Sequence, residues 1–403
     1  MAELCFKTLH FKDEERRIKV IFLKIFYFYI EKDELEKIGK FKVKDRSIIF
    51  DKVAEARAER KFSQLLFKGF NNLTNMVSGK NAVYIHRNSG IPLIGSNSFG
   101  IVDRNTSIVD IRPITSCNLN CIYCSVDSGI SSKNQTDFVV EREYLVEEFK
   151  KILDFKDCEL EIHLGTQGEP LLYAEIAELI KDFSSFEKVK TISIDTNATL
   201  LNEELVDRLA DAGLTRINVS INSLNPEIAK KMAGCKYNVE KIKKIVLYAS
   251  KKMQVAIAPV LLPGFNENDM EELIEFAKKL RKNNESYFIG IQNFLNYKFG
   301  RNPCKQLSWD QFYEKMRKLE KKTNTKLLLS ADDFNIKKTK KLPKPFKKGD
   351  VIEAQVICPG RIKNEMIAVS KNRSISVLNC FKKGKVKIKI IRDKHNIFVG
   401  IIA

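Results

Sequence analysis

Three cysteines lie close together in the first third of the chain, at Cys117, Cys121 and Cys124. A thiolate sulphur is a ligand for iron in iron–sulphur clusters, and a cluster of four irons needs four ligands. The local CxxxCxxC run supplies only three of them. One iron is then open to a ligand that the protein does not provide, so the chemistry predicted for this stretch is an iron–sulphur cluster with one reactive iron.

The three cysteines could instead form part of a zinc site or meet by chance in the core. Cysteine triples at other spacings occur in zinc sites, but zinc usually takes a fourth Cys or His nearby. His163 is the only histidine in the 60 residues after Cys124, and it falls on a separate expected strand. A chance meeting of three buried cysteines is disfavoured by the motifs further along the chain.

The cysteine spacing, with Tyr123 directly before the third cysteine, resembles the radical SAM superfamily. That resemblance implies that Cys117, Cys121 and Cys124 hold a [4Fe-4S] cluster whose open iron is chelated by the methionyl amine and carboxylate of S-adenosylmethionine (SAM). It also implies that one electron, from a donor such as ferredoxin or flavodoxin, cleaves SAM and releases a 5′-deoxyadenosyl radical. Tyr123 is expected to help bind SAM.

A second motif, LGTQGEPL at residues 164–171, follows the strand expected over residues 159–164. Glycine beside a carboxylate allows the backbone to approach a ligand closely while the acid meets an ammonium group. The motif resembles the GGEP element of the superfamily, which implies that Gly168 and Glu169 hold the methionyl amine of SAM. Gln167 stands where the first glycine is usual. The alternative is a helix-start turn with Glu169 in the first turn.

Polar side chains alternate with apolar ones along the strand expected over residues 215–221 and just beyond it. Asn218, Ser220 and Asn222 therefore share one face of this strand. The resemblance to radical SAM enzymes of the molybdenum-cofactor type implies that Ser220 and Asn222 contact SAM, although Asp is usual in place of Asn222.

Further polar residues are expected near the carboxyl ends of neighbouring strands. Asp195 and Thr196 begin the turn at the end of the strand expected over residues 190–195, where they either contact substrate or cofactor or cap the turn. His163 either lines the barrel near the substrate or is a core histidine with satisfied hydrogen bonds. The basic, aromatic loop at residues 297–303 either touches substrate or is an exposed crossover.

Strands and helices alternate from residue 107 to about residue 330, and this alternation positions the motifs. Six βα units indicate a parallel sheet, so the fold class is α/β. The family resemblance implies a partial (β/α)6 TIM-type barrel with its chemistry at the carboxyl ends of the strands. The expected strands cover residues 107–112, 159–164, 190–195, 215–221, 254–261 and 287–293, and the expected helices include 141–153, 202–212, 238–251, 268–281 and 309–323.

Length and charge divide the chain into three parts: an N-terminal accessory region at 1–100, the barrel at 101–332 and a small β-domain at 345–403. The net charge of +19 is concentrated after residue 332, where 18 Lys/Arg face 5 Asp/Glu. The longest apolar run, Val20 to Ile30, is interrupted by Lys24 and is expected to be a buried strand or helix, not a membrane span. Nine cysteines without paired spacing favour a reducing cytoplasm.

The C-terminal part begins with a basic, proline-containing linker at residues 337–345. Five short β runs follow, which predict a small β-barrel of the OB type and resemble the TRAM domain of several RNA-modifying enzymes. Lysines alternate with apolar residues over 385–389, so one face is cationic and suits phosphate groups. The alternative is a solvated lysine-rich surface. The runs cover residues 350–356, 366–370, 374–378, 385–391 and 397–402.

Three hypotheses of function follow from these patterns. The first is a radical SAM enzyme that acts on RNA, in the first place tRNA, which the basic C-terminal domain binds. The second keeps the enzyme but gives it a small-molecule cofactor precursor as substrate, and predicts that deletion of residues 340–403 leaves turnover largely intact. The third is a non-catalytic RNA-binding protein with a structural iron–sulphur cluster, against which Glu169 argues.

Overall fold

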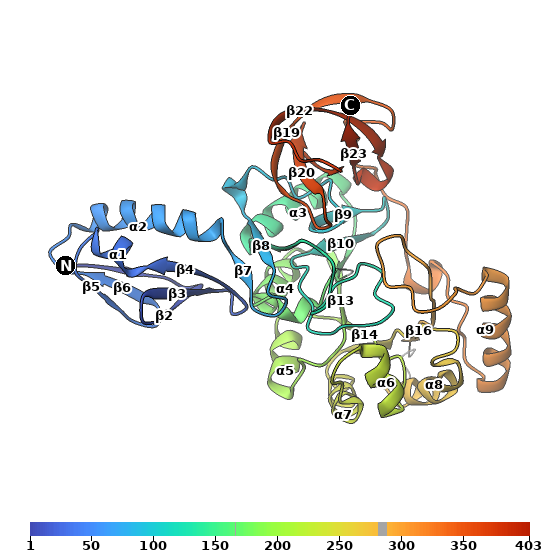
Figure 1. Ribbon diagram of the computed structural model, residues 1–403. Helices are drawn as coiled ribbons and strands as arrows, with labels where there is room; N and C mark the ends of the chain where they lie inside the picture. Colours follow the sequence, from blue (N-terminus) through green and yellow to red (C-terminus); the bar gives the residue numbers. More distant parts are fainter. Residues whose placement is uncertain (166, 281–287) are drawn as a thin grey trace.

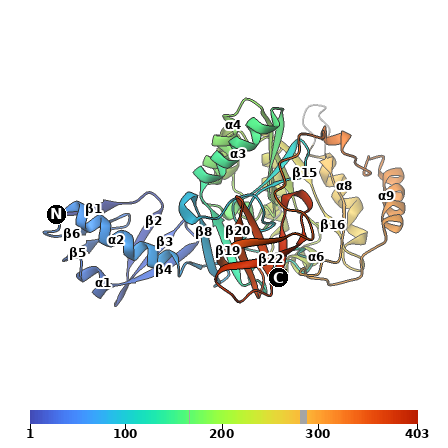
Figure 2. The ribbon, with the colours of Figure 1, turned by 90° about the horizontal axis from the view of Figure 1, so that it is seen from above.

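The computed structural model describes residues 1–165, 167–280 and 288–403. An arm formed by the N-terminal residues projects from a central α/β body, and a small β-barrel formed by the C-terminal residues caps the body in the view of Figure 1. Seen from above, that barrel lies between the arm and the helices at the far side of the body (Figure 2). None of the described helices combines the length and the apolar character that crossing a bilayer requires.

The central body is built on a curled sheet of seven strands in the order β17-β15-β14-β13-β12-β10-β9. Six of the strands run parallel, and β9 (Gly100–Asp103) adds an antiparallel edge beside β10. This arrangement confirms the α/β class and the partial (β/α)6 barrel. The parallel strands are β10 (Ile108–Arg112), β12 (Leu160–Leu164), β13 (Val189–Thr196), β14 (Arg216–Val219), β15 (Gln254–Ile257) and β17 (Phe288–Ile289).

Two of the expected strands are shorter or divided. The strand expected over 254–261 separates into β15 and β16 (Val260–Leu261), and β16 pairs with β18 (Gln292–Asn293) in a small sheet of its own. The strand expected over 287–293 separates into β17 and β18, and residue 287 lies outside the described residues. Both divisions fall at the end of the sheet where the expected site residues gather.

Amphipathic helices follow the strands of the central sheet and bury their apolar faces against it. Five of them match the expected ranges, and α4 and α6 lie outside those ranges. Asn202, Asn225 and Asn238 cap three of the helices by accepting hydrogen bonds from backbone N–H groups in the first turn. The helices are α3 (Arg142–Lys156), α4 (Ile176–Ser184), α5 (Glu203–Asp211), α6 (Pro226–Ala233), α7 (Val239–Ala249), α8 (Met270–Lys278) and α9 (Trp309–Thr323).

The N-terminal arm consists of a three-stranded sheet, β1-β6-β5, and a six-stranded sheet, β11-β8-β7-β4-β3-β2, with helices α1 and α2. The apolar run from Val20 to Ile30 forms a hairpin, as its two buried halves pair antiparallel. The strands are β1 (Ala2–Cys5), β2 (Leu9–Asp13), β3 (Arg17–Phe22), β4 (Phe26–Glu31), β5 (Phe41–Val43), β6 (Ser47–Phe50), β7 (Thr74–Asn75), β8 (Asn81–Ile85) and β11 (Thr136–Val140), and the helices are α1 (Lys32–Glu36) and α2 (Glu55–Phe70).

The C-terminal residues form a closed barrel in the order β19-β20-β21-β23-β22, as expected. Each of the five predicted β runs corresponds to one strand. A separate apolar core fills the barrel, with Phe346 and Phe398 packed edge to face within it. The strands are β19 (Val351–Pro359), β20 (Glu365–Ser370), β21 (Arg373–Leu378), β22 (Gly384–Arg392) and β23 (Val399–Ile402).

The C-terminal barrel is docked on the body by a buried ion pair. Arg361, between β19 and β20, pairs with Asp137 of β11, and the two side chains are only 6% and 4% exposed. Asp137 also accepts hydrogen bonds from Asn75 of the arm (2.6 Å) and Ser78 (2.7 Å). Thr115, which follows β10 of the body, donates to Asp137 as well (3.2 Å), so residues of the arm, the body and the barrel meet at one carboxylate.

The linker before the barrel is also fixed to the body. Thr339 N donates to the carbonyl of Asn105 (3.0 Å), and Lys337 accepts from Ser107 N through its backbone carbonyl (2.8 Å). The ammonium group of Lys156, at the end of α3, forms a fully buried ion pair with Asp103 (3.0 Å) beneath this segment. The basic linker is therefore anchored along its first half.

Candidate functional site

The three cysteines lie in the loop that follows β10, at the carboxyl end of the parallel sheet. All three line a cavity of about 920 Å³. The loop is held by backbone hydrogen bonds from Asn120 N and Ile122 N to the carbonyls of Ala233 and Met232 at the end of α6 (3.0 Å each). The structure thus places all three thiols on the lining of one cavity.

Burial dominates the electrostatics of two of these thiols, Cys117 and Cys121. It raises the pKa of Cys117 well above the ordinary value and that of Cys121 to about 12. Thiolate ligands in such an environment need a nearby positive charge, which iron ions supply. Within the part of the chain that the structure describes, no group of three or more His, Cys, Asp and Glu side chains could hold a single metal ion.

Glu169 lies deep in the same cavity, directly after β12. Its carboxylate accepts hydrogen bonds from Thr196 Oγ1 (2.7 Å), from Asn197 N (2.8 Å) and from Leu171 N (3.1 Å). Burial raises the pKa of Glu169 to about 7, and the hydrogen bond from Asn197 is the largest of the contributions that lower it. A ligand ammonium group would favour the ionised carboxylate.

Gly168 brings the backbone beside Glu169 close to the cysteine loop. Its φ is +70°, and a Cβ atom there would lie 2.3 Å from the carbonyl oxygen of Ser116. Glu169 N donates to that same carbonyl (2.7 Å). Only glycine fits this position without moving the segment that leads into Cys117.

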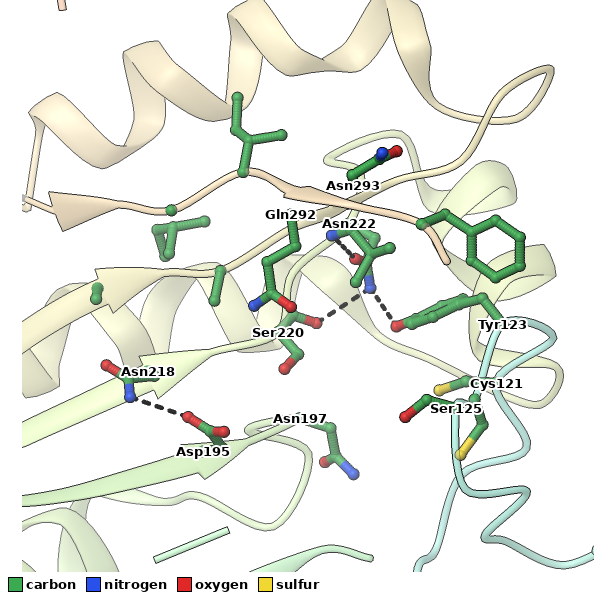
Figure 3. Close-up of a pocket in the computed structure, with 18 of the residues that line it drawn as sticks. Cys121, Tyr123, Ser125, Asp195, Asn197, Asn218, Ser220, Asn222, Gln292 and Asn293 are labelled. Atoms are coloured by element: carbon green, nitrogen blue, oxygen red, sulfur yellow. Dashed lines mark hydrogen bonds between the residues drawn. The ribbon is translucent and has the colours of Figure 1, made fainter. Parts of the chain in front are cut away.

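Ser220 and Asn222 follow β14 and line the same cavity as the cysteine loop (Figure 3). Asn222 Nδ2 donates to the hydroxyl of Tyr123 (2.5 Å), and Asn222 Oδ1 accepts from Val260 N (2.8 Å). Asn266 holds the backbone of this segment by donating to the carbonyl of Asn222 (2.7 Å). Tyr123 and Asn222, which lie 99 residues apart in the sequence, are therefore in direct contact.

His163, Asp195 and Asn218 form a polar row across three neighbouring strands on the cavity wall. His163 Nε2 lies 3.1 Å from Asp195 Oδ2, and Asn218 Nδ2 donates to Asp195 Oδ1 (2.9 Å; Figure 3). Burial lowers the pKa of His163, but Asp195 outweighs it and the net shift is upward; the pKa of Asp195 is lowered. The row therefore presents a carboxylate held in its ionised form. Thr196 turns toward Glu169 and caps the turn with its hydroxyl.

Arg301 is a site residue whose role the sequence pattern did not predict. Its guanidinium donates to Asp127 (2.5 Å) and Asn120 (2.8 Å) and reaches the carbonyl of Cys121 (3.2 Å), and Arg301 N donates to the carbonyl of Cys124 (2.9 Å). The loop at 297–303 is therefore fixed to the cysteine loop. Its basic charge was visible in the sequence, but its partner was not.

Comparison with known proteins identifies the family of this site. The model of the radical SAM superfamily matches residues 111–277, which include the three cysteines, Glu169, Ser220 and Asn222. The chain belongs to the radical SAM superfamily. It is 40% identical over 359 residues to the uncharacterized protein MJ0103 of Methanocaldococcus jannaschii, and the match covers 82% of each chain.

Relatives with named reactions match this radical SAM chain over shorter lengths. GTP 3′,8-cyclase of Aquifex aeolicus is 32% identical over 184 residues, and the probable GTP 3′,8-cyclase of M. jannaschii is 31% identical over 168 residues. These matches cover 44% and 41% of this chain, and 55% and 52% of those relatives. A solved structure of TYW1 with a lysine-pyruvate adduct is 18% identical, with a TM-score of 0.42, over 60% of this chain and 82% of that one.

Radical SAM enzymes use a [4Fe-4S] cluster and SAM, and these are the cofactors of this chain. The residues fit both groups: three free thiols line one cavity, and a buried carboxylate with a pKa of about 7 lies beside a glycine backbone. A cavity of about 920 Å³ is at the upper end of the range of about 300–1,000 Å³ for ligand pockets, so it has room for a substrate next to the cofactors.

Proposed function

We propose that Cys117, Cys121 and Cys124 hold the cluster of this radical SAM enzyme. When bound, the cluster and SAM supply a 5′-deoxyadenosyl radical that takes a hydrogen atom from an unreactive carbon of the substrate. Arg301 would offset part of the negative charge of the Cys121 thiolate.

SAM is held, in this proposal, by Tyr123, Gly168, Glu169, Ser220 and Asn222. Glu169 in its ionised form pairs with the methionyl ammonium group, and Gly168 allows the backbone to approach the same group. The hydrogen bond from Asn222 to Tyr123 orients the phenol ring above the cysteine loop. The ionised Asp195 binds a hydrogen-bond donor of the substrate, and His163 holds the Asp195 carboxylate in position.

The proposed substrate is RNA, in the first place tRNA. One observation carries this proposal: three lysines of β22, Lys385, Lys387 and Lys389, are exposed on a barrel that Arg361 anchors beside the cysteine loop. Their apolar neighbours point into the barrel core, so the three ammonium groups form a row on one face. Such a row suits successive phosphates of a nucleic-acid strand.

The test compares nucleosides digested from total tRNA and rRNA of a gene-deletion strain and its parent by mass spectrometry. We expect one modified nucleoside to disappear and its precursor to accumulate, because the enzyme would be the source of the modification. An unchanged nucleoside profile would contradict an RNA substrate. In vitro, substitution of all three lysines by glutamine should reduce the slope of log affinity for tRNA against log salt by about 2.

A free nucleotide is the second candidate substrate. The observation in its favour is the similarity to two GTP 3′,8-cyclases, which are 32% and 31% identical to this radical SAM chain. The chain spans about half the length of those cyclases, so their substrate is carried over only as a proposal. Under this candidate the triple lysine variant keeps full turnover, and the nucleoside profile of RNA does not change.

A further inference from the structure

The cavity ends at an aromatic wall that the radical SAM family match does not include. Helix α9 contributes Trp309, Phe312 and Tyr313 to the lining, all outside the matched residues 111–277. Trp309 is the only tryptophan of the chain. Its ring stacks on that of Tyr313, with centroids 5.6 Å apart and an angle of 27° between the planes, and Phe312 packs edge-on against it.

The stacked pair remains open to the cavity. Trp309 is 50% exposed and Tyr313 is 40% exposed, whereas Phe312 is buried. Each large aromatic ring buries about 150–250 Å² when it is covered, so two adjacent exposed rings at a cavity indicate a ligand surface. Their exposure is not a consequence of a frayed helix end.

The start of α9 is in fact fixed on both sides. Ser308 and Gln311 form a reciprocal capping box, and Lys315, one turn further, pairs with Glu267 (2.8 Å). Asn293 of β18 donates to the carbonyl of Leu307 (3.1 Å), two residues before Trp309. The two rings are therefore held in place before any ligand binds, which lowers the entropy lost on binding.

A buried polar atom of Asn293 provides independent evidence for a ligand in this cavity. It lies on the cavity lining and is only 8% exposed, yet its Oδ1 atom has no hydrogen-bond partner among the described residues. Gln292, the preceding residue, is exposed on the same lining. Side-chain amides of Asn and Gln recognise the edges of nucleobases through paired donors and acceptors.

We propose that Trp309 and Tyr313 form a stacking platform for a nucleobase of the substrate, whose polar edge is recognised by Asn293. This inference rests on the proposed function and deepens it, because it names the part of the substrate that enters the cavity. The base belongs to an RNA strand or to a free nucleotide. Tyr297, an exposed residue of the loop that Arg301 fixes, lines the same cavity.

The single tryptophan makes the platform directly observable. We would titrate the reconstituted holoenzyme, saturated with SAM, with a short single-stranded oligoribonucleotide, with GTP and with an abasic oligonucleotide of equal length. Stacking should quench the fluorescence of Trp309 saturably with the first probe or with GTP, and the abasic strand should leave it unchanged. If neither base-containing probe quenches the fluorescence, the proposal is overturned.

Variants separate stacking from general binding. Trp309→Ala and Tyr313→Ala should each weaken binding of the quenching probe about 5- to 150-fold in calorimetric titrations, because stacking on an aromatic ring contributes about 1–3 kcal/mol per base. Trp309→Phe should retain most of the affinity. Phe67→Ala, which removes another exposed ring on the distant helix α2, should leave the affinity unchanged. Equal affinity of Trp309→Ala and wild type would refute the platform.

The outcomes also separate this inference from the proposed function. Quenching by GTP alone supports the platform and refutes RNA as the substrate. If RNA binding depends on Lys385, Lys387 and Lys389 but does not change the fluorescence of Trp309, the RNA function is supported and the platform is refuted. Quenching by the oligoribonucleotide, lost in Tyr313→Ala, supports both.

Discussion

Substitution of Arg361 tests how the C-terminal barrel is coupled to the cysteine loop. The guanidinium group pairs with Asp137 and donates to the carbonyls of Thr136 (2.9 Å) and Thr115 (3.2 Å) and to the hydroxyl of Ser128 (3.1 Å). Thr115 and Ser128 flank the three cysteines on either side. Arg361→Met keeps most of the side-chain length and removes all of these contacts.

The expected loss of stability follows from the burial of the pair. Removal of one partner of a buried ion pair costs about 3–5 kcal/mol, because the other charge is left uncompensated. After Arg361→Met, Asp137 keeps hydrogen bonds from Asn75, Ser78 and Thr115. These three donors place the loss near the lower limit, at about 3 kcal/mol, and Asp137→Asn should cost about the same.

A double-mutant cycle read by chemical denaturation measures this coupling. The double variant should lose about 4 kcal/mol, not the sum of about 6, since the second substitution removes a contact that is already broken. Arg392→Met is the matched control, because it makes the same chemical change at an exposed position of the same barrel. The cluster content of each variant, measured by visible absorbance and iron analysis, should fall only in those that affect the Arg361–Asp137 pair.

Two results would refute this reasoning. A loss below about 1 kcal/mol in Arg361→Met would mean that the pair behaves like an exposed salt bridge. Full additivity in the cycle would mean that the two residues stabilise the protein independently. Either result would mean that the Arg361–Asp137 pair does not couple the barrel to the cysteine loop.

Two further substitutions test the site and the arm. Because burial raises the pKa of Glu169 to about 7, its carboxylate must lose a proton to pair with an ammonium group below that pH. SAM affinity should therefore fall by up to about tenfold for each pH unit below 7, and Glu169→Gln should abolish this dependence in calorimetric titrations of the holoenzyme. In the β3–β4 turn, Leu23 and Lys24 have φ of +46° and +67°; Lys24→Gly should raise the free energy of unfolding by about 1 kcal/mol, and a decrease would contradict strain at this turn.

The sequence was most informative where function depends on neighbours along the chain. The spacing of Cys117, Cys121 and Cys124 puts the three thiols in a single loop, and in the structure all three line one cavity. Alternation of apolar and polar residues similarly predicts strands of the C-terminal barrel, as in β22, whose lysines are exposed and whose alternate apolar residues are buried. The hairpin in the apolar run was harder to predict, since its turn residues, Leu23 and Lys24, carry none of the usual turn signals.

Contacts between distant segments could not be predicted in the same way. Arg361 lies 224 residues from Asp137 in the sequence. In the sequence it is one of many basic residues of the C-terminal part, and nothing distinguishes it from the others. Arg301 was visible as part of a basic loop, but no local pattern indicates that it binds the cysteine loop. Trp309 looks like the first residue of an ordinary amphipathic helix. Its exposure depends on how α9 packs, which is a tertiary property.

The docking of the barrel also changes how the two substrate hypotheses are best separated. Deletion of residues 340–403 would leave Asp137 as a buried carboxylate without its guanidinium partner, directly behind the cysteine loop. Activity should then fall whether the substrate is RNA or a small molecule, because the loop itself loses support. The exposed lysines of β22 give a cleaner comparison, since their substitution leaves the Arg361–Asp137 pair in place. Loss of turnover in Lys385→Gln, Lys387→Gln, Lys389→Gln with a stable fold would argue for RNA, and unchanged turnover would argue for a free nucleotide.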